Sequence, residues 1–170
     1  MSIQLKGSDD SVFTSDVLAP NIPTIPGGQF AGYQQGLWTP TASAGTIETA
    51  QGRWWRIGNN VTIQGQVVKL SDRSSAAINV AGIPYASIDF SAQVGYVGSV
   101  MAQFSSGSRT IAYLNTASER VQFYASSETV GGNWSGAAYN QLGTNNEFRF
   151  QLSYLTDDTT FVPINGATIS

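Results

Sequence analysis

The chain has 170 residues, a length typical of one domain, and only 11% of them are charged, against roughly 25% in an average domain. It contains no histidine and no cysteine, which excludes disulfides, thiolate metal sites, cysteine nucleophiles and the commonest general base, so we expect no cofactor and no metal ion. The net charge of -3 argues against binding to nucleic acid, and no apolar run is long enough for insertion into a membrane.

Residues 1–35 are predicted to form an extended arm or linker. Pro20, Pro23 and Pro26 stand three residues apart, which favours a polyproline-like path and interrupts any helix or central strand. Such terminal segments are often disordered; the alternative is that the arm anchors the protein to another chain. The apolar residues that would make the anchoring contacts are Ile3, Leu5, Phe13, Val17 and Leu18.

The remainder, residues 36–170, has the pattern of β-strands. Residues 53–57 and 61–70 flank a Gly-Asn-Asn turn and are predicted to form a hairpin. Within it Val61, Ile63 and Val67 fall on one face, and polar residues fall on the other. Further short strands are expected at residues 76–80, 94–104, 110–114 and 121–125, with an edge segment at residues 161–169.

The clearest alternation in the chain lies at residues 147–154. Phe148, Phe150, Leu152 and Tyr154 alternate with polar residues, which is typical of a strand with one buried and one solvated face in an antiparallel sheet. About eight strands with frequent turn signals, and no helical period, predict an all-β fold. We expect an antiparallel, jelly-roll-like β-sandwich behind the N-terminal arm.

Three tryptophans mark the first half of this domain. Adjacent residues of a strand point to opposite faces, so one of Trp54 and Trp55 is expected in the core and the other in a subunit interface or under a loop. Together with Trp38 they are our candidates for the core or for a trimer interface. Stacking on a ligand is the alternative interpretation.

Residues 126–146 form the longest irregular stretch of the domain and hold the best candidate for a receptor-binding loop. Aromatic and amide side chains between glycines can stack on a sugar ring and hydrogen-bond its hydroxyls. The candidates are Asn133, Trp134, Tyr139 and Gln141. In the competing interpretation the loop packs Trp134 onto the end of the sandwich, because large aromatic side chains seldom stay fully exposed.

The acidic residues do not predict a catalytic site. Glycoside hydrolysis needs two carboxyl groups about 5–10 Å apart, and no spacing in the chain forces such a pair together. The adjacent pairs Asp9-Asp10 and Asp157-Asp158 are interpreted as turn residues. We therefore expect the protein not to be an enzyme.

Three motifs carry a resemblance to a known family. Residues 36–41 read GLWTPT, residues 52–65 read GRWWRIGNNVTIQG and residues 82–85 read GIPY. In this order they resemble a module of the tail-fibre and appendage proteins of tailed bacteriophages. The resemblance implies a homotrimeric virion structural protein on the exterior of the tail or capsid. Its expected partners are further copies of itself, other virion proteins bound through the arm, and a glycan or protein of the host surface.

Two roles are consistent with these sequence features. The first is a short tail fibre or receptor-binding appendage, in which several weak sites combine into strong attachment to the host. The second is a capsid cement or decoration protein, whose arm and trimeric sandwich stabilise the head by binding the assembled shell. A polysaccharide-degrading enzyme ranks third. Because the first residues lack the apolar core of a secretory signal, synthesis is expected in the host cytoplasm.

Overall fold

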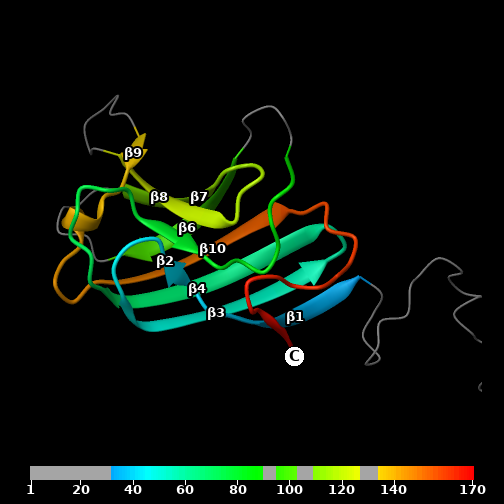
Figure 1. Ribbon diagram of the computed structural model, residues 1–170. Helices are drawn as coiled ribbons and strands as arrows, with labels where there is room; N and C mark the ends of the chain where they lie inside the picture. Colours follow the sequence, from blue (N-terminus) through cyan, green and yellow to red (C-terminus); the bar gives the residue numbers. More distant parts are fainter. Residues whose placement is uncertain (1–31, 90–94, 103–108, 127–133) are drawn as a thin grey trace, which may run out of the picture. The chain divides into compact units, whose positions relative to one another are not determined.

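A computed structural model describes residues 32–89, 95–102, 109–126 and 134–170 of the chain (Figure 1). The chain divides into two units, Met1–Tyr33 and Gln34–Ser170, and the fold below is that of the second unit. Some predicted residues lie outside the described ones: Ile3, Leu5, Phe13, Val17, Leu18 and Asn133.

The described residues form an all-β structure, as predicted, and contain no α-helix. One short 3-10 helix, η2 (Tyr139–Gln141), lies between the ninth and tenth strands. The strands in chain order are β1 (Tyr33–Trp38), β2 (Thr41–Ala42), β3 (Ile47–Ile57), β4 (Asn60–Leu70), β5 (Asn79–Ala81), β6 (Tyr96–Ala102), β7 (Arg109–Leu114), β8 (Arg120–Ser126), β9 (Trp134–Gly136), β10 (Glu147–Leu155) and β11 (Thr168–Ile169).

These strands join into one antiparallel sheet with the order β11-β1-β3-β4-β10-β6-β7-β8-β5-β2, and β9 pairs with β8 outside this path. Only two residues separate β1 from β2, although β2 is the last strand of the order and β1 the second. The sheet must therefore curl until its two ends approach, because two residues span less than about 11 Å. It forms a half-barrel (Figure 1).

The predicted hairpin is confirmed as β3 and β4, which pair from Ile57–Asn60 at the turn to Ile47–Leu70 at the far end. Gly58 has a φ of +56° in this turn, a left-handed conformation that glycine adopts without a steric penalty. The alternation predicted for residues 147–154 is also confirmed, since every second side chain of β10 is buried. The stretch 126–146, predicted to be irregular, contains the short elements β9 and η2.

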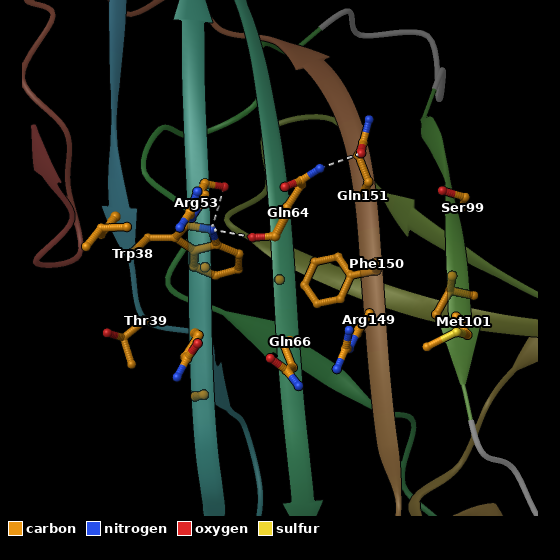
Figure 2. A pocket seen from close by; sticks show the side chains of 16 residues that line it. Trp38, Thr39, Arg53, Gln64, Gln66, Ser99, Met101, Arg149, Phe150 and Gln151 are labelled. Atoms are coloured by element: carbon orange, nitrogen blue, oxygen red, sulfur yellow. Dashed lines mark hydrogen bonds between the residues drawn. The ribbon is translucent and has the colours of Figure 1, made fainter. Parts of the chain in front are cut away.

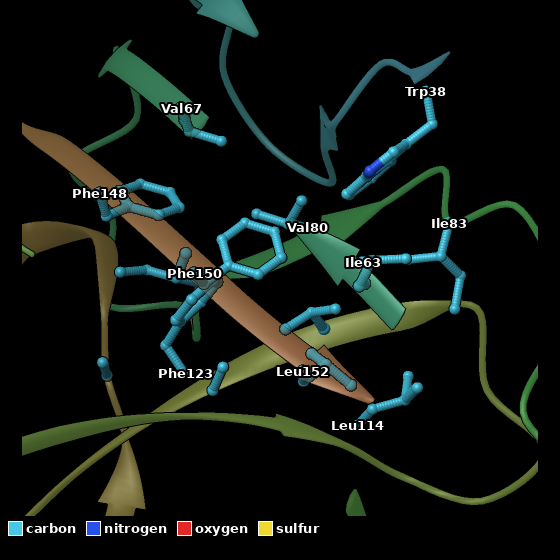
Figure 3. Close-up of a cluster of buried hydrophobic side chains, with 14 of the residues drawn as sticks. Trp38, Ile63, Val67, Val80, Ile83, Leu114, Phe123, Phe148, Phe150 and Leu152 are labelled. Carbon is cyan, nitrogen blue, oxygen red and sulfur yellow. The ribbon is translucent and has the colours of Figure 1, made fainter. Parts of the chain in front are cut away.

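The inner face of the sheet holds a continuous aromatic and aliphatic core (Figure 3). The Phe123 ring packs edge-on against Phe148 and Phe150, with centroids 5.1 and 5.4 Å apart, and Phe150 contacts Trp38 at 6.2 Å. Packing of this kind contributes about 0.5–1.5 kcal/mol per aromatic pair beyond the burial of apolar area. The core therefore joins β1, β8 and β10, which are far apart in the strand order.

Two glycines make room for these rings. Gly52 and Gly65 lie opposite one another on β3 and β4. A Cβ atom on Gly52 would come within 2.2 Å of Trp38 Nε1, and one on Gly65 within 2.4 Å of Phe150 Cζ. Trp38 Nε1 instead donates hydrogen bonds to the carbonyl oxygens of Arg53 and Gln64, at 3.2 and 3.0 Å. The indole thus links β3 and β4 from the inner face of the sheet.

A buried charge lies next to the β3–β4 turn. Arg56 is 0% exposed, and its guanidinium donates to the Asp158 carboxylate at 2.9 Å and to the carbonyl oxygens of Gly58 and Asp158. The same group lies over the rings of Tyr85 and Phe161, at 4.5 and 3.9 Å from their centroids. This cluster ties the C-terminal segment to the first hairpin.

Candidate functional site

The outer face of the sheet carries two rows of polar side chains across four strands. Because Trp54, Ile63 and Phe150 point into the core, their neighbours in sequence point outward. The register of β3, β4, β10 and β6 aligns the outward residues into rows: Arg53, Gln64, Gln151 and Ser99 in one, and Gln51, Gln66, Arg149 and Met101 in the next.

Side-chain hydrogen bonds order the middle of these rows. Gln64 Nε2 donates to Gln151 Oε1 at 2.8 Å, as Figure 2 shows. Gln66 Nε2 and Arg149 Nε both donate to Glu147 Oε1, at 2.8 and 2.7 Å. The hydrogen bonds from Arg149 and Gln66 hold the pKa of the Glu147 carboxyl below its ordinary value, so it stays ionised and keeps its two donors.

A groove of about 810 Å³ lies over the two rows (Figure 2). It extends from Leu37 and Thr39, in and just after β1, to Ser99 and Met101 of β6, and Gly52 and Gly65 are among the residues that line it. We call this hollow, with the two rows of side chains, the outer-face groove. Its volume falls in the range of about 300–1,000 Å³ that is usual for small-molecule sites.

Several hydrogen-bonding groups in the groove are not used within the fold. Gln64 Oε1, Gln151 Nε2 and the two terminal guanidinium nitrogens of Arg149 have no hydrogen bond to any residue that the structure describes. The exposed Arg53 side chain likewise forms no ion pair or hydrogen bond within the described ranges. The groove can therefore offer donors and acceptors to a bound polar molecule.

The predicted receptor-binding loop is divided by the structure. Trp134 is 48% exposed on β9, whereas Tyr139 is fully buried with its hydroxyl 3.1 Å from Ser43 Oγ. Gln141 Oε1 accepts a hydrogen bond from the Ala138 N–H at 2.9 Å and caps η2. Of these side chains, Trp134 is the one presented to solvent, and its contact with a ligand stays a prediction.

The three candidate tryptophans also separate. Trp38 and Trp54 are 3% and 1% exposed and belong to the core, where Trp54 packs edge-on against Tyr85 at 5.5 Å. Trp55 is half-buried on the outer face, opposite Thr62 of β4. Trp55 therefore stays the candidate for a contact with another copy, and Trp38 and Trp54 belong to the core of the chain.

Two acidic residues of the described segments bind other side chains of the fold. Glu48 pairs with Lys69 at 2.9 Å, and Glu119 accepts a hydrogen bond from Asn165 at 3.1 Å. Among the described residues, no group of three acidic side chains lies close enough to hold a metal ion. Within the same ranges, no helix has the length and apolar character that a membrane span requires.

The sequence prediction did not identify the groove. The alternation in β4 and β10 had already assigned Gln64, Gln66, Arg149 and Gln151 to solvated faces, and this was the available signal. What was missing was the pairing of β10 between β4 and β6, which brings these faces together.

The chain matches no protein-family model, no curated protein and no solved structure.

Proposed function

We propose that this protein is a structural component of a tailed-phage virion that attaches the particle to a glycan on the host surface. The observation that carries the proposal is the outer-face groove, whose free amide and guanidinium groups suit the hydroxyl groups of sugars. The three sequence motifs that resemble phage tail-fibre and appendage proteins support the virion assignment.

The groove is suited to weak, repeated binding. Its side chains stand on four adjacent strands of a hydrogen-bonded sheet, so little backbone ordering is needed when a ligand binds. An open groove gives modest affinity by itself, but several copies on one particle raise the effective affinity by orders of magnitude, about 10²–10⁴-fold. Attachment would then result from many copies acting together.

We further propose that the subunit is the jelly-roll-like sandwich predicted from the strand pattern and that three copies assemble, as the resemblance implies. The end of the outer face near the β3–β4 turn is more apolar than the groove. Ile57, which is 64% exposed, and Leu155 lie there on either side of Asn60 of β4. Trp55 lies on this face as well. Contact between copies at this end would cover apolar area and leave the groove open.

The test is the location of the protein on intact particles. Gold-labelled antibodies raised against residues 36–170 are viewed by electron microscopy on particles that carry this chain. Labelling of the tail or baseplate is expected. Labelling spread over the head would overturn attachment in favour of the cement role, and the absence of labelling on every particle would refute the virion assignment.

A further inference from the structure

We infer that the outer-face groove binds the carboxylate groups of an acidic polysaccharide; this inference rests on the proposed function and specifies its ligand. The protein as a whole is acidic, with a net charge of -3. The groove differs, because its lining includes Arg53 and Arg149 and no aspartate or glutamate; Glu147 beside it pairs with Arg149 and offsets one of the two positive charges, which leaves a net positive charge. This local reversal of charge favours an anionic ligand over a neutral one.

The two groove arginines keep free donors, whereas three other basic residues of the described segments are engaged by neighbouring groups. Arg56 is buried in its ion pair, Lys69 binds Glu48, and Arg73 donates to the carbonyl oxygens of Leu70 and Gly143. Arg149, by contrast, gives only its Nε to Glu147. The planar edge that remains can donate two parallel hydrogen bonds to a carboxylate, the strongest arrangement available to a guanidinium.

The spacing of the arginines indicates a polymer as the ligand. Arg53 on β3 and Arg149 on β10 are separated by β4 and offset by one row. With about 4.8 Å between strands and about 3.3 Å per residue, their Cα atoms stand about 12 Å apart on a diagonal. At that separation each guanidinium can bind a carboxylate of its own. A chain with carboxylates on separate sugars supplies two of them and places its hydroxyls on Gln64, Gln66 and Gln151 in between (Figure 2).

The test uses the full chain and measures binding by calorimetry at low salt. The probes are short oligosaccharides of alginate, polygalacturonate and hyaluronate, each with free carboxylates and again with the carboxylates methyl-esterified. We expect at least one free form to bind and its ester to bind at least about tenfold more weakly, as expected when a charge-assisted hydrogen bond is lost. Added salt should weaken the binding as well.

Substitutions assign the binding to the groove. Arg53→Gln and Arg149→Gln should each lower the affinity about tenfold, and both side chains are exposed, so the fold should persist in circular dichroism. Arg120→Gln is the matched control, because it removes the same charge from an exposed position on β8 outside the groove. It should bind like the unaltered chain. Trp134→Ala tests the predicted receptor-binding loop in place of the groove.

Clear results would overturn the inference. With the unaltered chain, these results are the absence of binding to every free form or equal binding of free and esterified forms. With the variants, they are binding that survives both arginine substitutions or loss of binding in Trp134→Ala alone. If sedimentation shows that Arg53→Gln dissociates an oligomer, a second copy occupies the groove and the inference is also wrong. Tail labelling without charge-dependent binding would leave the proposed function standing, whereas charge-dependent binding without virion labelling would refute that function alone.

Discussion

Replacing Asp158 with alanine is predicted to destabilise the fold by about 3 kcal/mol, because the substitution leaves a buried guanidinium without its carboxylate. Removal of one member of a buried ion pair costs about 3–5 kcal/mol. The lower end applies here, since the carbonyl oxygens of Gly58 and residue 158 and the rings of Tyr85 and Phe161 still surround Arg56. Such a loss is a large part of the roughly 5–15 kcal/mol that stabilises a domain.

The assay is urea unfolding at pH 7, followed by tryptophan fluorescence. Trp54 is a suitable reporter because it packs against Tyr85, one of the rings over Arg56. Glu48→Ala is the control: it breaks an ion pair in which both side chains are about half exposed, and it should cost less than about 1 kcal/mol. The reasoning would be refuted if Asp158→Ala cost no more than this control.

The same variant should reveal a dependence on pH. Burial of Asp158 disfavours its charged form, but hydrogen bonds from Arg56, Thr160 and the Phe161 N–H outweigh burial and lower the pKa of the carboxyl. A carboxyl with a lowered folded-state pKa stabilises the fold above its unfolded-state pKa of about 4. That contribution disappears as the pH falls through the folded-state value. The difference between the native chain and Asp158→Ala should therefore shrink in acid, and a constant difference would contradict the assignment.

Three further predictions concern the core. Gly65→Ala places a Cβ atom 2.4 Å from Phe150 and should lower the free energy of unfolding in urea by about 1–3 kcal/mol. The control Gly143→Ala, whose Cβ meets no atom within 4 Å, should lower it far less, and equal losses would contradict the packing argument. Tyr139→Phe removes a buried, hydrogen-bonded hydroxyl and should lower stability by about 1 kcal/mol in thermal unfolding, so an unchanged melting temperature would count against it. Burial raises the pKa of Tyr154 above its ordinary value, so its neutral form stabilises the fold below about pH 10 and this stability is lost as the pH rises further. Tyr154→Phe should reduce that alkaline loss of stability, and an unaltered alkaline profile would exclude Tyr154 as its source.

The parts of the fold that could be predicted are those whose signal is local. The β3–β4 hairpin combines alternating β-branched residues with a Gly-Asn turn, and β10 alternates over its whole length. Both signals are contained within the segment that they describe. β9 has no such signal, because three residues cannot show a period, and it forms by pairing with the end of β8.

Features that depend on distant partners were not predictable. Arg56 stands in a surface-like pattern of bulky and charged residues, yet it is buried because Asp158, 102 residues later, supplies a carboxylate. Tyr139 was expected on a binding loop, but Ser43 and the backbone of Asn79 provide partners for its hydroxyl inside the fold. The groove was not predictable for the same reason, since the pairing of β3, β4, β10 and β6 aligns its two rows.

The position of β10 has a consequence for how the protein is made. This strand lies between β4 and β6 and pairs with both, yet its residues are synthesised after all of theirs. Until Glu147–Leu155 has emerged from the ribosome, β4 and β6 each present an unpaired edge, and such edges attract other chains. Closing the sheet also requires contacts of long sequence separation, which form slowly. The nascent chain thus passes through an aggregation-prone state that ends when β10 pairs with β4 and β6.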